Sequence, residues 1–144
     1  MIFDLDYAKK KITATYLAQE GIESIVNMRD NYVLFSNDPN DWNDFRAKFI
    51  KCSVAPRCGL DTSIAQMDIN SIFLCTAHLN GCQLYVNNGD YNTNSVGADS
   101  GFARKIWADT NVSDQIKIYS EVSWLQGSGI YTATFTQTLY NWIE

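Results

Sequence analysis

The sequence predicts an α+β fold in which a mixed central sheet or a β-sandwich carries two or three helices on its outside. Alternating apolar and polar residues dominate the chain from residue 70 onward, and two closing segments, 115–124 and 129–142, alternate along their whole length. Aromatic residues make up 13% of the chain, which favours a sheet over a helical bundle. Helical spacing near the start of the chain and a short aromatic stripe supply the expected outer helices.

The first third of the chain predicts one helix and one hairpin. Residues 4–20 have apolar positions near helical spacing and are expected to form a helix that ends at Gly21. The β-branched residues 12–16 also alternate, so an edge strand over part of this segment stays open. Two β-rich runs, 22–28 and 32–36, flank a turn-forming Arg-Asp-Asn cluster and predict a hairpin.

A short second helix is expected to start at Asp41, which can cap it. Its aromatic side chains recur at helical spacing and are expected to pack in the core, with a ligand platform as the alternative; they are Trp42, Phe45 and Phe49. Residues 52–61 contain Pro and Gly and are expected to form an irregular connection.

Residues 71–86 form two apolar runs that meet at a Leu-Asn-Gly-Cys corner, and both runs are expected to be strands. Residues 87–90 then form a turn. Asp99 or Ser100 is expected to cap a third helix that turns Phe102 inward, with Arg104 and its neighbour Lys105 outward.

The chain is expected to form one domain spanning residues 1–144, because a chain of this length buries about two-thirds of its unfolded surface. Its net charge is −5 and no basic run is longer than Lys9 to Lys11, which argues against a nucleic-acid partner. The first residues lack the pattern of a signal peptide, and no apolar run approaches the ~20 residues of a membrane span. We therefore expect a soluble protein, and delivery into a host or target cell cytoplasm by a route that needs no such signal is compatible with this.

Four cysteines permit three disulfide pairings, but a domain of this size without a secretory signal has little need of them. Together with His78 they could be read as zinc ligands. However, no Cys-x-x-Cys pair is present, and Cys75 and His78 would face opposite sides of a regular strand. We expect free thiols, no metal and no other cofactor.

Cys82 follows the corner and starts a strand. A kink of this kind can project a thiol out of a sheet with backbone N–H groups of Gly81 and Cys82 beside it, as a cysteine nucleophile and its oxyanion hole require. The alternative is a small core residue, which is the common role of a cysteine in an apolar strand.

The pattern Thr76-x-x-Leu79-Asn80-Gly81-Cys82 resembles the Thr-x-x-Leu-Ser-Gly-Cys signature of the cysteine-dependent glutamine deamidase toxins, which include the cytotoxic necrotizing factor catalytic domain and the Burkholderia lethal factor. The resemblance covers roughly residues 70–109. It implies a deamidase-toxin-like fold and a hydrolase that acts on a glutamine side chain of a target protein. Cys82 would then be the nucleophile, Thr76 would orient the catalytic histidine, and Asn80 replaces the serine of the signature.

The sequence departs from this family at the catalytic histidine. The family has it about a dozen residues after the cysteine, where this chain has Asn92 or Asn94, and an amide cannot accept the thiol proton. The only histidine is His78, four residues before Cys82 and on the same strand face as Thr76. His78 is therefore either the base or a structural strand residue.

Two functional hypotheses follow from different classes. In the first, the chain is a cysteine-dependent protein-glutamine deamidase, a toxin or effector domain with impaired or altered catalysis. In the second, it is a non-catalytic protein-binding module on the same fold, which keeps a pocket for a partner's side chain and holds it with an aromatic-rich surface. The reactivity of Cys82 discriminates between them.

Overall fold

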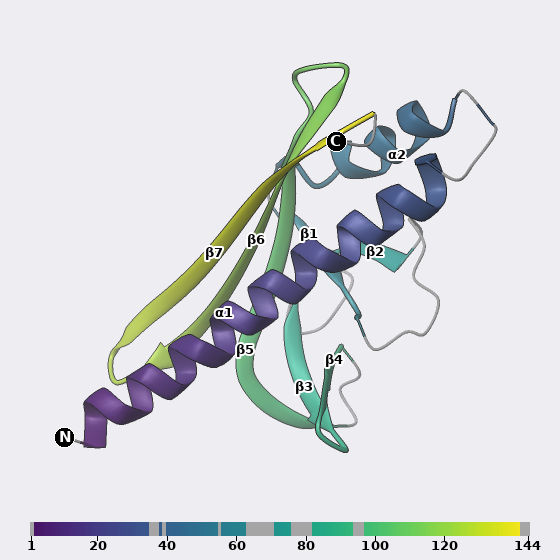
Figure 1. Cartoon of the computed structure of the whole chain (residues 1–144). Helices are drawn as coiled ribbons and strands as arrows, with labels where there is room; N and C mark the ends of the chain where they lie inside the picture. Colours follow the sequence, from purple (N-terminus) through teal and green to yellow (C-terminus); the bar gives the residue numbers. More distant parts are fainter. Residues whose placement is uncertain are drawn as a thin grey trace.

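A long N-terminal helix lies along one face of a twisted antiparallel sheet (Figure 1). The computed structural model describes residues 2–34, 38, 40–54, 56–62, 71–75, 82–93 and 97–141, without the side chains of 2–4 and 34. The elements in chain order are α1 (Ile2–Arg29), the π-helical turn η1 (Asp30–Leu34), α2 (Asp41–Ile50), β1 (Cys58–Leu60), β2 (Ile72–Leu74), β3 (Gln83–Asn87), β4 (Asp90–Asn92), β5 (Ala98–Asp109), β6 (Gln115–Gln126) and β7 (Gly129–Tyr140). The predicted α+β class is confirmed, with the described strands in a single seven-stranded sheet.

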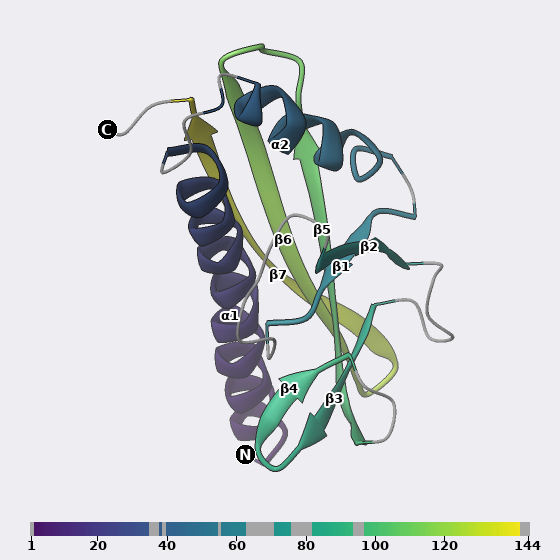
Figure 2. The same cartoon turned by 90° about the vertical axis from the view of Figure 1, so that its right-hand side faces the viewer.

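The central strand β5 organises the sheet. On one side it pairs with β6, which in turn pairs with β7 along the whole length of both strands. On its other side it pairs with both β3 and β1, and these carry β4 and β2 outward. Figure 2 shows the consequence: the β3–β4 hairpin stands beside the N-terminal half of α1, and α2 lies at the opposite end of the sheet.

The first helix is longer than predicted, and the hairpin expected at 22–28 and 32–36 is wrong. The apolar positions keep helical spacing past Gly21, and α1 continues to Arg29 before η1. One stripe of the helix is buried from residue 14 to residue 28: Ala14, Leu17, Ala18, Gly21, Ile22, Ile25 and Met28. Packing of this stripe against the sheet outweighs the β-branched content of the segment. Although α1 has 28 residues, no helix among the described residues combines the length and apolar character needed to cross a bilayer.

The aromatic helix is confirmed as α2, and its aromatic side chains are in the core as expected, but its N-cap is Asn40 and not the predicted Asp41. Phe45 and Phe49 are fully buried with ring centroids 5.1 Å apart, and Trp42 is 5% exposed. The Trp42 indole N–H donates to the backbone oxygen of Ser113 at 2.9 Å, which ties α2 to the β5–β6 loop.

The helix expected from Asp99 or Ser100 is wrong, because this segment forms the 12-residue strand β5. Every second side chain from Phe102 to Ala108 is buried, which is the period of a strand. Arg104, expected to point outward, therefore points inward and is 1% exposed. The two closing strands are confirmed as β6 and β7, and the turn at 87–90 is confirmed with Asn88 at φ 54°.

The interior contains two hydrophobic clusters. One gathers around the C-terminal half of α1 and α2, and the other gathers around the N-terminal half of α1 with Phe102 and Trp124. Buried polar side chains lie where they meet: Arg104 stands on β5 between Phe102 and Ile106, and Ser120 stands on β6. Gly21 faces them, and a Cβ there would lie 2.7 Å from the Ser120 hydroxyl oxygen. The absence of a side chain at Gly21 therefore lets the helix approach this polar layer.

Candidate ligand-binding site

The four cysteines form two disulfides, so the expectation of free thiols is wrong. Cys52 bonds to Cys58 and Cys75 bonds to Cys82, with Cα atoms 5.2 and 5.0 Å apart. Each disulfide joins cysteines that are close in sequence, 6 and 7 residues apart, and both lie beside the antiparallel pair of β1 with β2, since Cys58 begins β1 and Cys75 follows β2. Spacing along the sequence could not show this arrangement.

Cys82 is held in the interior next to β1 and β5. It is 2% exposed, its backbone oxygen accepts a hydrogen bond from the Arg104 N–H at 3.0 Å, and its sulfur is packed against Gly59. In the disulfide it has no thiol proton, so the nucleophilic role predicted for Cys82 requires prior reduction. Zinc sites bind the metal through cysteine thiolates, which a disulfide does not supply. The described residues contain no group of three His, Cys, Asp or Glu that could hold a metal.

The other residues of the predicted catalytic set are placed differently. Thr76, His78, Asn80 and Gly81 lie outside the described residues, as does Asn94. Asn92 is described: it ends β4, is 8% exposed and pairs across the hairpin with Tyr85 of β3. Their catalytic roles stay predictions.

Gly59 is predicted to be sensitive to substitution because it adjoins the second disulfide. A Cβ at this position would lie 2.5 Å from the Cys82 sulfur and 2.7 Å from the Phe73 ring, and neither can move freely inside the sheet. We expect Gly59→Ala to lower the free energy of unfolding by about 1–3 kcal/mol in urea denaturation. The matched control is Gly129→Ala, where the nearest atom is 3.7 Å from the added Cβ. Equal stability of the two variants would contradict this packing.

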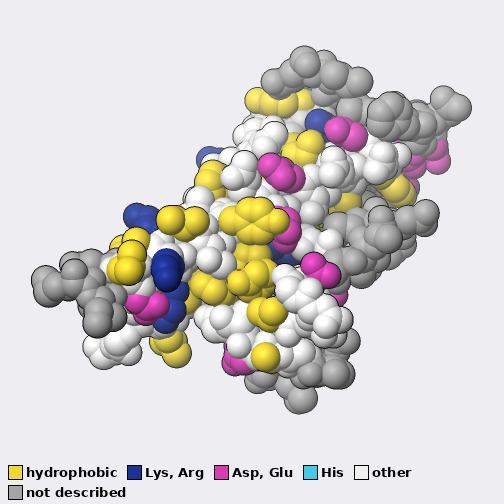
Figure 3. Space-filling view, turned by 60° about the horizontal axis from the view of Figure 1, so that its bottom comes forward, with side chains coloured by type: hydrophobic (Ala, Val, Ile, Leu, Met, Phe, Trp, Pro, Cys, Tyr) yellow, Lys and Arg dark blue, Asp and Glu magenta, His cyan; other side chains and the backbone are white. Residues whose placement is uncertain are grey.

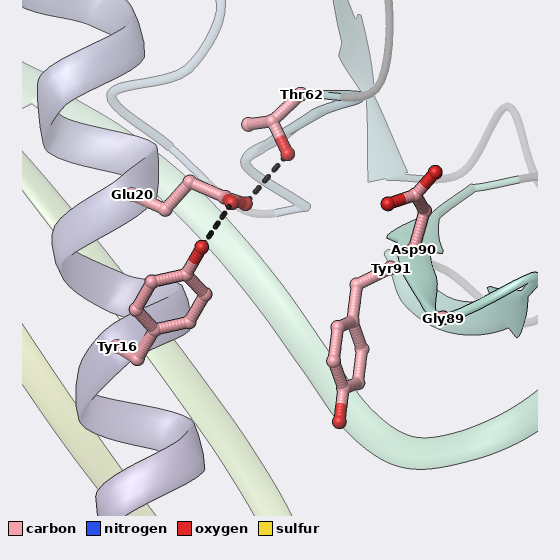
Figure 4. A pocket seen from close by; sticks show the side chains of 6 residues that line it. All are labelled: Tyr16, Glu20, Thr62, Gly89, Asp90 and Tyr91. Carbon is pink, nitrogen blue, oxygen red and sulfur yellow. Dashed lines mark hydrogen bonds between the residues drawn. The ribbon is translucent and has the colours of Figure 1, made fainter.

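A pocket of about 380 Å³ opens between α1 and the β3–β4 hairpin. Two helix residues line one wall and two hairpin side chains the other, as Figure 4 shows: the lining residues are Tyr16, Glu20, Thr62, Gly89, Asp90 and Tyr91. Carboxylates and aromatic rings therefore stand on both walls. Helix and hairpin are brought together because β3 and α1 both pack on β5.

Glu20 is the centre of the hydrogen bonds in this pocket. Its Oε1 accepts from the Thr62 hydroxyl at 2.6 Å and from the Arg104 guanidinium at 3.0 Å, and its Oε2 accepts from the Tyr16 hydroxyl at 3.3 Å. The Glu20 side chain is 28% exposed, so the carboxylate is fixed from below and open to the pocket. This arrangement holds a negative charge in one orientation before any ligand arrives.

Arg104 supports the pocket from the interior. Its guanidinium donates to the backbone oxygens of Leu17 and Leu60, both at 3.0 Å, in addition to Glu20. Burial lowers the pKa of Arg104, and the hydrogen bond and charge of Glu20 oppose that effect. Arg104 thus joins α1, β1 and β5 at one point, directly beneath the Glu20 carboxylate.

The electrostatic balance of the pocket is negative. Asp61, next to Thr62, accepts from the Thr93 hydroxyl at 3.0 Å, and Asp90 is an exposed carboxylate with no partner among the described residues. With Glu20, these make three carboxylates in or beside the pocket, and the buried guanidinium of Arg104 pairs with Glu20. The negative charge of Glu20 also raises the pKa of Tyr16, which keeps that phenol neutral in ordinary buffers.

One face of the molecule combines hydrophobic and acidic side chains. Figure 3 shows hydrophobic side chains gathered along its centre with acidic groups beside them, and Lys and Arg concentrated toward the N-terminal end of α1. A surface that is apolar and negatively charged attracts cations carrying an apolar stem.

None of the residues that line this pocket was predicted from the sequence as a site residue. Glu20 and Arg104 are 84 residues apart, and neither belongs to a motif. One signal was present in the sequence. Arg104 shares its strand face with the apolar residues Phe102, Ile106 and Ala108, so a strand over this segment buries a charged side chain in the core. Neither a family model, nor a curated protein, nor a solved structure matches the chain.

Proposed function

We propose that this protein is a non-catalytic binding module that holds a positively charged side chain of a partner protein in the pocket between α1 and β4. The observation that carries the proposal is the oriented Glu20 carboxylate facing the pocket, with the exposed carboxylate of Asp90 on the opposite wall. A guanidinium or ammonium group entering between them gains charge-assisted hydrogen bonds.

The aromatic residues support the same ligand class. Tyr16 is 59% exposed beside Glu20, and Tyr91 lines the other wall. Aromatic faces bind the alkyl stem of Lys or Arg and attract its charged end. A volume of about 380 Å³ accommodates one such side chain but not a folded segment, which makes a single anchoring residue the natural occupant.

The disulfides favour a binding module over a hydrolase. A cysteine nucleophile acts as a thiolate, and the sulfur of Cys82 is bonded to Cys75. Two disulfides also support a place of action in an oxidising compartment rather than a reducing cytosol.

Short peptides test the proposal directly. We expect acetyl-Gly-Arg-Gly-amide to bind in isothermal titration calorimetry, and acetyl-Gly-Gln-Gly-amide neither to bind nor to release ammonia. Asp90→Asn should weaken binding of the Arg peptide ~10-fold, the loss of one charge-assisted contact. Asp114→Asn is the control with the same charge change, because Asp114 lies in the β5–β6 loop at the opposite end of the sheet (Figure 2).

Two outcomes would overturn the proposal. The first is equal affinity of the Asp90→Asn and Asp114→Asn variants for the Arg peptide, which places binding elsewhere. The second is ammonia release from the Gln peptide by the oxidised protein, which would make the chain an enzyme.

A further inference from the structure

Of the strands that the structure describes, none pairs with the outer side of β7. β7 is the edge of the sheet (Figure 1) and pairs with β6 over all 12 residues, from Gln115 opposite Tyr140 to Gln126 opposite Gly129, without a register shift. At the end of the strand, the Tyr140 backbone oxygen accepts a hydrogen bond from the Arg29 guanidinium at 2.8 Å. One edge of β7 thus offers a row of N–H and C=O groups to another strand.

This edge lacks the features that normally prevent strands from pairing. β7 reads GIYTATFTQTLY, with no charged residue and no proline, and it has no bulge. Natural edge strands are commonly protected by Lys, by Pro or by a bulge. In a chain with a net charge of −5, an uncharged 12-residue edge is also the place where two copies meet with least repulsion.

The order of the side chains matches a second copy of the same strand. Residues directly opposite each other in an antiparallel sheet point to the same face, so a two-fold axis must pass through a residue. An axis at Phe135, near the middle of β7, puts Phe135 opposite itself and puts Thr134 opposite Thr136. It also puts Thr132 opposite Thr138 on the same open face. Aromatic pairs and Thr–Thr pairs both stabilise antiparallel neighbours.

We propose that two copies of this chain pair their β7 strands in antiparallel orientation about a two-fold axis at Phe135, which makes one continuous sheet across a homodimer. Phe135 is 37% exposed in the single chain, and this contact covers it with its own counterpart. The interface is independent of the pocket at Glu20, which lies between α1 and the β3–β4 hairpin.

Substitution at the strand centre tests the dimer. We expect the wild-type protein to show a concentration-dependent monomer–dimer equilibrium in sedimentation velocity. The double substitution Thr134→Lys with Thr136→Lys puts two pairs of like charges in contact across the axis and should raise the dimer dissociation constant at least ~10-fold. The net charge of each chain changes from −5 to −5 + 2 = −3, which reduces the overall repulsion. Weaker association would therefore come from the edge itself.

The control variant carries Asn111→Lys with Ser113→Lys, two exposed positions in the β5–β6 loop, and should dimerise at least as well as wild type. Circular dichroism checks that each monomer stays folded. If the edge variant does not fold, hydrogen exchange of the wild type decides, since β7 amides should gain protection as the concentration rises. A wild-type protein that is monomeric at all concentrations, or an edge variant that dimerises as well as wild type, would overturn the proposal.

Discussion

Replacing Arg104 with Met is expected to lower the free energy of unfolding by about 3–5 kcal/mol, the largest effect of any single substitution considered. The substitution leaves the Glu20 carboxylate without its ion pair and leaves the buried backbone oxygens of Leu17 and Leu60 without their donor. Urea denaturation followed by tryptophan fluorescence measures the loss.

The neighbouring residue supplies the control for this prediction. Lys105 is on the same strand but is exposed on the opposite face, so Lys105→Met should change stability by no more than about 0.5 kcal/mol. Adding Glu20→Gln to Arg104→Met should recover part of the loss, because the remaining partner is then uncharged. A loss below about 1 kcal/mol for Arg104→Met would show that the polar layer does not hold the helix to the sheet.

Reduction of both disulfides is expected to cost about 4–6 kcal/mol, since each closes a short loop worth roughly 2–3 kcal/mol in the chain-entropy estimate. The separations of 6 and 7 residues place both near the low end of that scale. The total free energy of unfolding of most small domains is only about 5–15 kcal/mol. The reduced protein should therefore be close to its unfolding threshold at about 25 °C.

Denaturation curves with and without reductant measure this effect. Cys75→Ala combined with Cys82→Ala should reproduce about half of it and should remain sensitive to reductant through the Cys52–Cys58 disulfide. Thiol titration in denaturant without reductant should find no free thiol. Finding four free thiols, or no change of stability on reduction, would contradict the disulfide assignment.

The elements that the sequence predicted correctly are those whose pattern has one interpretation. β6 and β7 alternate without interruption, and the aromatic spacing of α2 fits a helix alone. The errors fall where two periods compete. Residues 22–28 combine β-branched side chains with helical spacing, and the packing of Ile22, Ile25 and Met28 against the sheet decides for helix. At Ala98–Asp109, capping residues favoured a helix while the alternation favoured the strand that forms.

Sequence patterns could not predict the candidate site, for a different reason. Glu20, Thr62 and Asp90 come from a helix, a loop and a hairpin, and only the sheet brings them together. The motif around Cys82 is local and is recognisable in the sequence, whereas the bond between Cys82 and Cys75 is evident only in the structure. Local spacing predicts elements, and long-range pairing decides which side chains meet.

The proposed binding of a positively charged side chain is tested most directly by amide chemical-shift mapping with N-acetyl-arginine N-methylamide as the probe. The oxidised wild-type protein is titrated, and the glutamine analogue serves as the control ligand. We predict saturable shifts centred on Tyr16, Glu20, Thr62, Asp90 and Tyr91 for the arginine probe, which sodium chloride weakens, and no shifts there for the glutamine probe. Shifts confined to residues outside this pocket, or equal shifts from both probes, would contradict the proposed function.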